Sequence, residues 1–384
     1  MSIDPALVRA SLARVEPHAE RAAAYFYGRL FAEDPALRAM FPPVMDVRRE
    51  RLFVSLGQIA ALLERPRDLR EYLGQLGRDH RKYGVAPEHY TAVGRALIAA
   101  VRRYSGHAWD SATESAWVSA YTMAANHMIG AAAETDGPAW ARAEVVAHER
   151  RGESIAVLTL LPAVRVPYRA GQYVSVQTAR HPRIWRTYSV ANAPAPDGLI
   201  RLHVRAVPGG HVSSALVKET RVGDELVVGP AMGTMAAPEG ERELLFAAGG
   251  TGLAPLKAII EQILASGRRP GIHLLFGARS AQDLYDLPDL LALAARHPRL
   301  RLVPVVSHDG GPARGLASGD TLSGMLPDVL ERFRAWTDHE AYVCGPPAMV
   351  EATVRRLLRD GVPRARIHHD LASDRPALPE ATVW

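Results

Sequence analysis

The sequence predicts a multidomain chain in which an all-α domain is followed by an antiparallel β-barrel and then by an α/β domain with a parallel sheet. Three observations predict this order. Residues 1 to about 135 show helical periodicity broken at proline turns, residues 140–235 contain short β-rich runs between turns, and strands alternate with helices from residue 240 onward. We place the domains at residues 1–137, 138–238 and 239–384.

Composition narrows the class of protein. The chain of 384 residues has 48% hydrophobic and 23% charged residues, which is ordinary for globular domains, and it is too long for one core. The net charge of +5 is scattered rather than gathered into a basic patch, so we expect no nucleic-acid binding. Cys344 is the only cysteine, which excludes an intramolecular disulfide and a cysteine-rich metal cluster. With no leader pattern and no long apolar run, we expect a cytoplasmic protein without membrane insertion.

The first domain carries a histidine on an apolar helical stripe. Residues at three- and four-residue steps share one helix face and place His80 toward the core: Leu69, Leu73, Leu76, His80 and Tyr83. A histidine in such a stripe is by itself more often a core residue than a ligand. The remaining histidines of this domain are expected at the surface or at its boundary: His18, His89, His107 and His127.

The two later domains are outlined by strands and turns. Barrel strands are expected at residues 154–161, 172–177, 187–190, 199–207 and 225–228. The α/β domain should have strands at 243–248, 272–276, 300–306 and 341–344, with helices at 255–265, 286–296 and 347–360.

A glycine-rich turn joins the first strand of the α/β domain to its helix. Its backbone N–H groups, placed at a helix N-terminus, suit a phosphate group: Gly249, Gly250, Thr251 and Gly252. The alternative is a tight turn without a ligand, because the spacing lacks the Gly-x-Gly-x-x-Gly fingerprint.

The Arg-Thr-Tyr-Ser segment that begins at Arg186 and the later glycine-rich turn resemble motifs of the ferredoxin-reductase-like superfamily, and they occur in the same order. The resemblance implies that Arg186 holds the FAD pyrophosphate, Tyr188 lies against the isoalloxazine, and Ser189 hydrogen-bonds near flavin N5. It adds further FAD-binding residues: Tyr173, Thr187, Gly209, Gly210, Val212 and Ser213. Without a flavin, Tyr188 would be a packed strand residue and Arg186 a solvated charge.

The same resemblance extends the nicotinamide site beyond the glycine-rich turn. It adds the residues that follow two later strands: Arg279, Ser280, Cys344, Gly345 and Pro346. Arg279 and Ser280 suit a 2′-phosphate but also occur with NADH, so the choice between NADH and NADPH stays open. Cys344 is equally well explained as a small buried residue and is not expected to be a nucleophile.

The helical domain resembles the globin of bacterial flavohaemoglobins, on the segments 25–31, 34–41 and 83–94, and all three domains resemble that family in order. The resemblance implies a globin fold that holds haem b. It carries over His80 as the axial iron ligand and Tyr27 as the distal hydroxyl donor. Phe41 and Leu52 then line the haem pocket, and Tyr90 lies against the axial histidine.

Several positions depart from the family pattern. Arg48, a further pocket residue, stands where a distal glutamine is common, and Asp79 stands where a lysine is common. Ala132 replaces the proximal glutamate, with Glu134 two residues later, and Ala372 replaces an aromatic residue expected over the flavin. These substitutions resemble a divergent actinobacterial-type subgroup, and they bear on the speed of flavin-to-haem transfer.

The resemblance implies an NAD(P)H-dependent oxidoreductase that acts as a nitric oxide dioxygenase. NAD(P)H reduces FAD, the flavin reduces haem, and nitric oxide and oxygen become nitrate. One alternative is a flavin reductase whose globin senses gas or haem, and another is an oxygen-binding globin without turnover. The expected partners are small molecules (oxygen, nitric oxide and a nicotinamide), and the expected state is a monomer or weak dimer.

Overall fold

The computed structural model describes residues 3–42, 46–308, 321–333 and 336–370, with only the backbone for 46–51. Contacts divide the chain into two compact units. Residues 1–140 with 181–185 form the helical unit, and residues 141–180 with 186–371 form the second unit.

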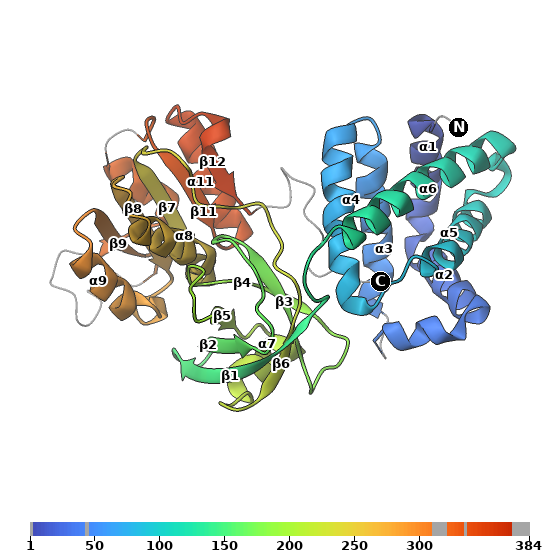
Figure 1. Cartoon of the computed structure of the whole chain (residues 1–384). Coiled ribbons are helices and arrows are strands. Elements are labelled where there is room, and N and C mark those ends of the chain that lie inside the picture. The colour runs from blue at the N-terminus through green and yellow to red at the C-terminus, as the bar shows by residue number, and fades with distance from the viewer. Residues whose placement is uncertain (1–2, 43–45, 309–320, 334–335, 371–384) are drawn as a thin grey trace. The chain divides into compact units, whose positions relative to one another are not determined.

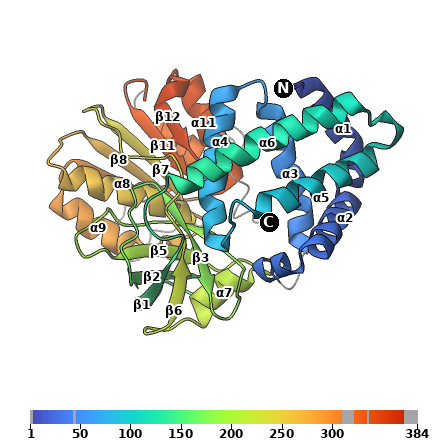
Figure 2. The ribbon, with the colours of Figure 1, turned by 45° about the vertical axis from the view of Figure 1, so that its right-hand side comes forward.

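The helical unit is built from six α-helices that cross one another (Figures 1 and 2). They are α1 (Pro5–Val15), α2 (Ala19–Glu33), α3 (Asp46–Leu62), α4 (Pro66–His80), α5 (His89–Ser105) and α6 (Ser111–Ala133), with 3₁₀ turns at Glu16–His18, Pro35–Met40, Arg81–Tyr83 and Gly106–Ala108. The proline turns mark breaks because proline lacks the N–H that would continue a helix. The expected all-α domain is confirmed.

The approach of α4 to α6 depends on Gly77. An added Cβ at Gly77 would lie 2.3 Å from the carbonyl oxygen of Met128 on α6, so a larger residue would push the two helices apart. The helices lie side by side in both views (Figures 1 and 2). Gly77 precedes His80 by three residues on α4, so this contact fixes the helix end that carries the imidazole.

The second unit begins with a six-stranded antiparallel sheet in the order β4-β3-β6-β1-β2-β5. Its elements are β1 (Ala141–Arg150), β2 (Ile155–Pro162), β3 (Tyr173–Thr178), β4 (Arg186–Ser189), β5 (Ile200–Arg205), helix α7 (His211–Lys218) and β6 (Glu225–Val228). A bridge between Val190 and Leu202 links the β4 and β5 sides, so the sheet is nearly closed into the expected barrel. Sequence reasoning missed β1 and α7. Strand β1 was missed because its buried positions are alanines and one valine between charged residues.

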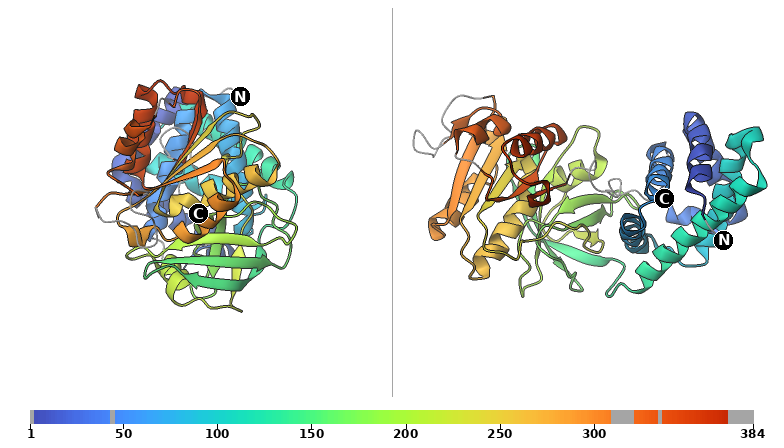
Figure 3. Two further views of the ribbon diagram at one scale, coloured as in Figure 1. Left: turned by 90° about the vertical axis from the view of Figure 1, so that its left-hand side faces the viewer. Right: turned by 90° about the horizontal axis from the view of Figure 1, so that it is seen from above.

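The α/β part is a parallel sheet in the order β10-β9-β8-β7-β11-β12, with helices on both faces (Figure 3). Its elements are β7 (Leu244–Gly249), α8 (Leu253–Ala265), β8 (Ile272–Ala278), α9 (Leu287–Arg296), β9 (Leu300–Val306), β10 (Leu322–Ser323), α10 (Leu326–Val329), β11 (Glu340–Cys344), α11 (Pro347–Arg359) and β12 (Ile367–His369), with 3₁₀ turns at Gly250–Gly252, Ala281–Asp283, Leu330–Arg332 and Arg364–Arg366. Phe246 on β7 packs with α8 and α9, whereas the next residue, Ala247, packs with α10 and α11. This alternation is that of a strand buried on both faces, and the expected fold class is confirmed.

No helix in the described part of the chain is long and apolar enough to cross a membrane.

Candidate haem, flavin and nicotinamide sites

The helical unit contains a cavity that opens beside His80. The residues that line it come from α2, α4, α5 and the turns that follow α2 and α4, and they are mostly apolar: Leu30, Leu37, Met40, Phe41, His80, Tyr83, Val85, His89, Tyr90 and Val93. Three of the predicted haem-pocket residues, Phe41, His80 and Tyr90, therefore line one cavity. An apolar cavity with an imidazole in its wall suits haem, which is held by an axial histidine among apolar side chains.

The imidazole of His80 is held in one tautomer. Its Nδ1 lies 2.6 Å from the carbonyl oxygen of Leu76, and a carbonyl only accepts, so Nδ1 carries the proton. Burial lowers the pKa of His80 to about 3, against the raising effect of the Leu76 carbonyl, and the charge of Lys82 lowers it further. The ring is thus neutral at physiological pH and has its lone pair on Nε2, which is the form that binds iron.

His89 also lines the cavity but is held in the opposite tautomer. Its Nδ1 accepts a hydrogen bond of 3.0 Å from the backbone N–H of Ala86, so in the neutral ring the proton is on Nε2. The half-buried His89 was expected at the surface or at the domain boundary, and its place in the cavity wall was not foreseen. Of these two cavity histidines, the hydrogen bonds leave only His80 with a lone pair on Nε2.

The proximal surroundings contain a carbonyl where the family pattern has a carboxylate. Ala132 lies half-buried on α6, and Glu134 caps the end of that helix with an exposed side chain. Leu76 supplies the acceptor for His80 instead. A neutral carbonyl orients the imidazole but raises its basicity less than a carboxylate does.

A buried ion pair lies directly beside the axial position. The Asp79 carboxylate and the Lys82 ammonium are 2.5 Å apart and are almost completely shielded from water. Burial raises the pKa of Asp79, while Lys82 lowers it. Each charge therefore compensates the other, which buried ionised groups require.

The remaining predicted haem-pocket residues, Tyr27, Leu52 and Arg48, lie on α2 and α3. Tyr27 is buried on α2 with its ring 5.7 Å from the ring of Phe41, and Leu52 on α3 belongs to the same hydrophobic cluster. Neither is among the residues that line the cavity in the described part of the chain. Arg48 lies on α3, but its side chain is outside the described residues, as is all of Ala372.

The predicted flavin residues gather on neighbouring strands of the barrel. Every residue of β4 is half-buried, and side chains alternate, so Arg186 and Tyr188 share one face while Thr187 and Ser189 share the other. Tyr173 pairs with Ser189 in register and lies on its face. The strand can therefore present an arginine and an aromatic ring together, as a flavin diphosphate requires.

The second flavin segment forms the start of α7. Gly209 has φ +73°, and an added Cβ at Gly210 would lie 2.5 Å from Ser213 Oγ. That hydroxyl donates to the carbonyl of Gly210, and both Val212 and Ser213 are buried in the first turn. These glycines are required by the turn that sets the helix N-terminus.

The two glycine-rich turns of the nicotinamide site pack against each other after β7 and β11. An added Cβ at Gly252 would lie 2.5 Å from the backbone of Cys344 and Gly345, and one at Gly345 would lie 3.0 Å from Gly249. Gly250 adopts φ +54°, and Thr251 is half-buried beside it. Most of these glycines are thus explained by close backbone approach at the carboxyl ends of parallel strands, which is where α/β sheets bind ligands.

Cys344 and its neighbour Pro346 complete that edge. Cys344 is fully buried, with Sγ 3.8 Å from the sulfur of Met235, and burial raises the pKa of its thiol. The thiol is therefore held protonated, as expected of a residue that is not a nucleophile. Pro346 is the residue before α11, and its ring lies 2.9 Å from an added Cβ at Gly249.

Arg205 is a candidate phosphate ligand that sequence reasoning missed. Its guanidinium, at the end of β5, lies 3.3 Å from an added Cβ at Gly250. An arginine beside a glycine-rich turn at a helix N-terminus provides directed donors for a phosphate. No sequence signal separates Arg205 from the other exposed arginines, because only the packing of the barrel against the parallel sheet brings it to this turn.

The loop after β8 carries Arg279 and Ser280. Arg279 is exposed, whereas the Ser280 hydroxyl donates 2.9 Å to the carboxylate of Asp283 in a capping box. A carboxylate at this point suits the hydroxyls of a ribose and repels a 2′-phosphate, while Arg279 would attract one.

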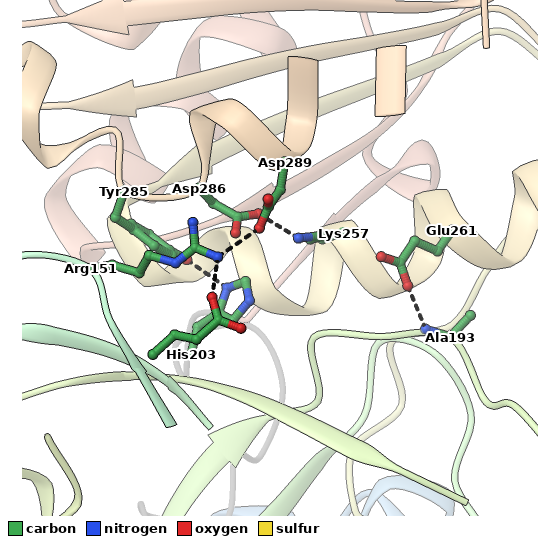
Figure 4. Close-up of polar contacts among 9 residues, drawn as sticks. Arg151, Ala193, His203, Lys257, Glu261, Tyr285, Asp286 and Asp289 are labelled. Carbon is green, nitrogen blue, oxygen red and sulfur yellow. Dashed lines mark hydrogen bonds and ion pairs between the residues drawn. The ribbon is translucent and has the colours of Figure 1, made fainter. Parts of the chain in front are cut away.

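A polar network, partly buried, joins the barrel to helices α8 and α9 within the second unit (Figure 4). His203 on β5 lies 2.7 Å from the Tyr285 hydroxyl, and Lys257 on α8 pairs at 2.6 Å with Asp286. Arg151, in the turn between β1 and β2, forms an ion pair of 3.0 Å with Asp289 on α9. These contacts fix the predicted flavin barrel against the nucleotide sheet.

Comparisons with known proteins cover the chain in three parts. A globin family matches residues 24–128, an oxidoreductase FAD-binding domain matches 143–236, and an oxidoreductase NAD-binding domain matches 246–355. The flavohemoprotein of Bordetella pertussis is 28% identical over 390 residues, which covers 95% of this chain and 96% of the relative. The chain belongs to the flavohaemoglobin family.

Two further similarities agree with this membership. The crystal structure of a Malassezia yamatoensis flavohemoglobin with bound FAD and heme has a TM-score of 0.79 at 19% identity, covering 95% of this chain and 97% of that one, which shows the shared fold. The electron transfer component XylA of the Pseudomonas putida xylene/toluene monooxygenase is 33% identical over 229 residues. That match covers 59% of this chain, which spans 64% of the relative's length.

This flavohaemoglobin is an NAD(P)H-dependent oxidoreductase with globin, FAD-binding and NAD-binding domains, and its cofactors are haem, FAD and a nicotinamide dinucleotide. The alternative of a flavin reductase with a sensor globin is not favoured, because the matched flavohemoprotein spans both halves of the chain.

Proposed function

We propose that this flavohaemoglobin is a nitric oxide dioxygenase, in which a hydride from NADH or NADPH supplies the electrons that turn nitric oxide and oxygen into nitrate. The observation that carries the proposal is the neutral His80 imidazole, fixed by Leu76 in the wall of an apolar cavity. It occurs in a chain that also carries flavin- and nicotinamide-binding domains. An oxygen store would need no such electron supply.

The residues are given the following roles in this proposal. His80 would hold the haem iron through Nε2, and Phe41 and Tyr90 would close the cavity around the porphyrin. Haem supplies the oxygen chemistry when it is bound. Tyr27, beside Phe41, and Leu52 would complete the distal side, where the Tyr27 hydroxyl would supply a hydrogen-bond donor.

The reductase residues are assigned by the same reasoning. Arg186 would bind the flavin diphosphate, Tyr188 would lie on the flavin ring and Ser189 would donate to it, with the turn before α7 nearby. The turns after β7 and β11 would bind the nicotinamide dinucleotide, with Arg205 on its phosphates. We place the domain boundaries at residues 137 and 238, and we infer a cytoplasmic monomer or weak dimer that binds no nucleic acid.

The test measures nitric oxide with an electrode in aerobic buffer, with the purified protein loaded with haem and FAD and supplied with NADH or NADPH. We expect rapid consumption of nitric oxide, formation of nitrate and oxidation of one nicotinamide for every two nitrates, because a hydride carries two electrons. A His80→Ala variant should keep anaerobic flavin reduction and lose nitric oxide consumption. Flavin bleaching without haem reduction in the wild-type protein would reject the proposal.

A further inference from the structure

Two histidines and a glutamate meet at the edge of the parallel sheet that lies opposite the nicotinamide turns. Glu243 directly precedes β7, His339 directly precedes β11, and His273 is the second residue of β8. Strand β7 lies between β8 and β11 in the sheet, so the three residues begin neighbouring strands. One ligand atom from each residue lies within 4.8 Å of the other two.

The register of the strands produces this meeting. Glu340 pairs with Leu244 across β11 and β7, which places His339 next to Glu243. Leu245 pairs with His273 across β7 and β8, so His273 and Glu243 lie on the same face of the sheet, two positions apart. None of the residues of the proposed flavin and nicotinamide sites takes part.

Gly271 makes room for the carboxylate. An added Cβ at Gly271 would lie 2.0 Å from Glu243 Oε2, so the carboxylate occupies the place that a side chain at 271 would take. The glycine precedes β8 directly, and its φ is not in the left-handed region. The Glu243 carboxylate therefore lies over Gly271, where a larger residue would compete with it for space.

The two histidines have unused nitrogen atoms. The Nδ1 atoms of His273 and His339 are shielded from solvent and have no hydrogen-bond partner in the described residues. Trp336 covers both rings, with centroid distances of 5.4 Å to His273 and 4.8 Å to His339. A shielded ring nitrogen without a partner is costly, and a bound ion would remove that cost.

The rings are also kept in the protonation state that a metal requires. Burial lowers the pKa of His273, and nearby His339 and Arg301 lower it further, while Glu243 raises it. Burial lowers the pKa of His339 as well, against Glu243 and Asp338. Both imidazoles are therefore neutral at physiological pH.

We propose that Glu243, His273 and His339 bind a divalent transition-metal ion, with Zn²⁺ as the best fit. Two imidazoles and one carboxylate form a common ligand set for Zn²⁺, and a water molecule would fill the fourth tetrahedral position. Tetrahedral bonds of about 2.0–2.1 Å require ligand atoms about 3.3 Å apart, which side-chain rotation reaches from the observed spacing. The ion would tie the beginnings of β7, β8 and β11 together and stabilise the nucleotide-binding domain.

The experiment is a calorimetric titration of the tag-free protein, loaded with haem and FAD, with Zn²⁺. We expect one site whose affinity is unchanged by saturating NAD⁺, because the nicotinamide turns lie at the other end of the strands. Glu243→Gln and His339→Gln should each weaken Zn²⁺ binding at least about tenfold. Even groups that only hydrogen-bond to a metal ligand contribute that much to metal affinity. Glu243 is exposed, so its variant leaves the Trp336 packing intact.

One control variant, one further test variant and a spectroscopic measurement make the outcome decisive. His297→Gln removes a half-buried histidine of the same domain and should bind Zn²⁺ like the wild-type protein. Gly271→Ala should weaken binding, because it displaces the Glu243 carboxylate. Zinc-edge X-ray absorption, which the haem iron does not disturb, should show two imidazole ligands. Wild-type affinity in Glu243→Gln, or no binding at roughly millimolar Zn²⁺, would overturn the proposal.

Discussion

The imidazole Nδ1 of His80 lies 2.6 Å from the carbonyl oxygen of Leu76, one turn earlier on the same helix. This single contact sets the tautomer and fixes the ring plane at the cavity wall. It provides an acceptor for the imidazole in a chain that has Ala132 where the family pattern has a glutamate. The basicity of the proposed iron ligand therefore depends on a backbone group that no side-chain substitution removes.

The packing of α4 on α6 should be sensitive to one glycine. Gly77→Ala places a methyl group against the Met128 carbonyl, and we expect it to destabilise the globin domain by about 1–3 kcal/mol and to weaken haem retention. Gly130→Ala on α6 is the control, because its added Cβ meets nothing within 4 Å. It should be neutral or stabilise by up to about 1 kcal/mol. Thermal unfolding followed at the haem absorbance band measures both, and equal effects of the two variants would contradict the packing argument.

Stability of the reductase part should fall in mild acid because of His203. Burial lowers the pKa of His203 well below its usual value, and the charges of Lys257, Arg151 and Arg201 lower it further. Below about pH 6.5 the unfolded chain binds a proton that the folded chain excludes, so the unfolding free energy decreases by about 1.4 kcal/mol per pH unit.

The measurement is urea unfolding followed by flavin release at several pH values between about 7.5 and 5.5. His203→Gln should lose this share of the pH dependence, while His297→Gln should keep it. An unchanged slope in His203→Gln would show that the buried His203–Tyr285 contact does not carry the effect.

The glycine-rich turn after β7 should depend on the guanidinium beside it. Arg205→Ala is expected to raise KM for NADH and NADPH by about tenfold, because it removes a charge-assisted contact to a phosphate. Arg201→Ala, on the same strand and also exposed, should leave KM unchanged. Steady-state reduction of a soluble dye, which bypasses haem, measures the effect. Equal KM values in the two variants would remove Arg205 from the site.

Local pattern and motif order were enough to predict the fold class and most strands and helices. Leucines at helical spacing predicted that His80 faces the core, as it does, and the family resemblance proposed it and the β4 motif as site residues. Residues that depend on tertiary approach could not be found. Arg205 meets Gly250 only when the barrel and the sheet pack together, and Glu243, His273 and His339 meet only through parallel strand register.

The place of His89 in the cavity wall could not be predicted for a related reason. A turn after α4 returns the chain to the cavity, and the N–H of Ala86 then fixes the ring nitrogen that faces it. Sequence spacing alone does not reveal this return, because it depends on Gly84 with φ +74°.

The account rests on which of two cavity histidines binds iron. The direct measurement is haem content per chain, with ligation read from the absorption spectrum, in His80→Ala and His89→Ala purified alongside the wild-type protein. We expect His80→Ala to lose haem or its axial imidazole, and His89→Ala to retain wild-type haem content and spectrum. Full haem loading with an unchanged five-coordinate imidazole spectrum in His80→Ala would contradict the account.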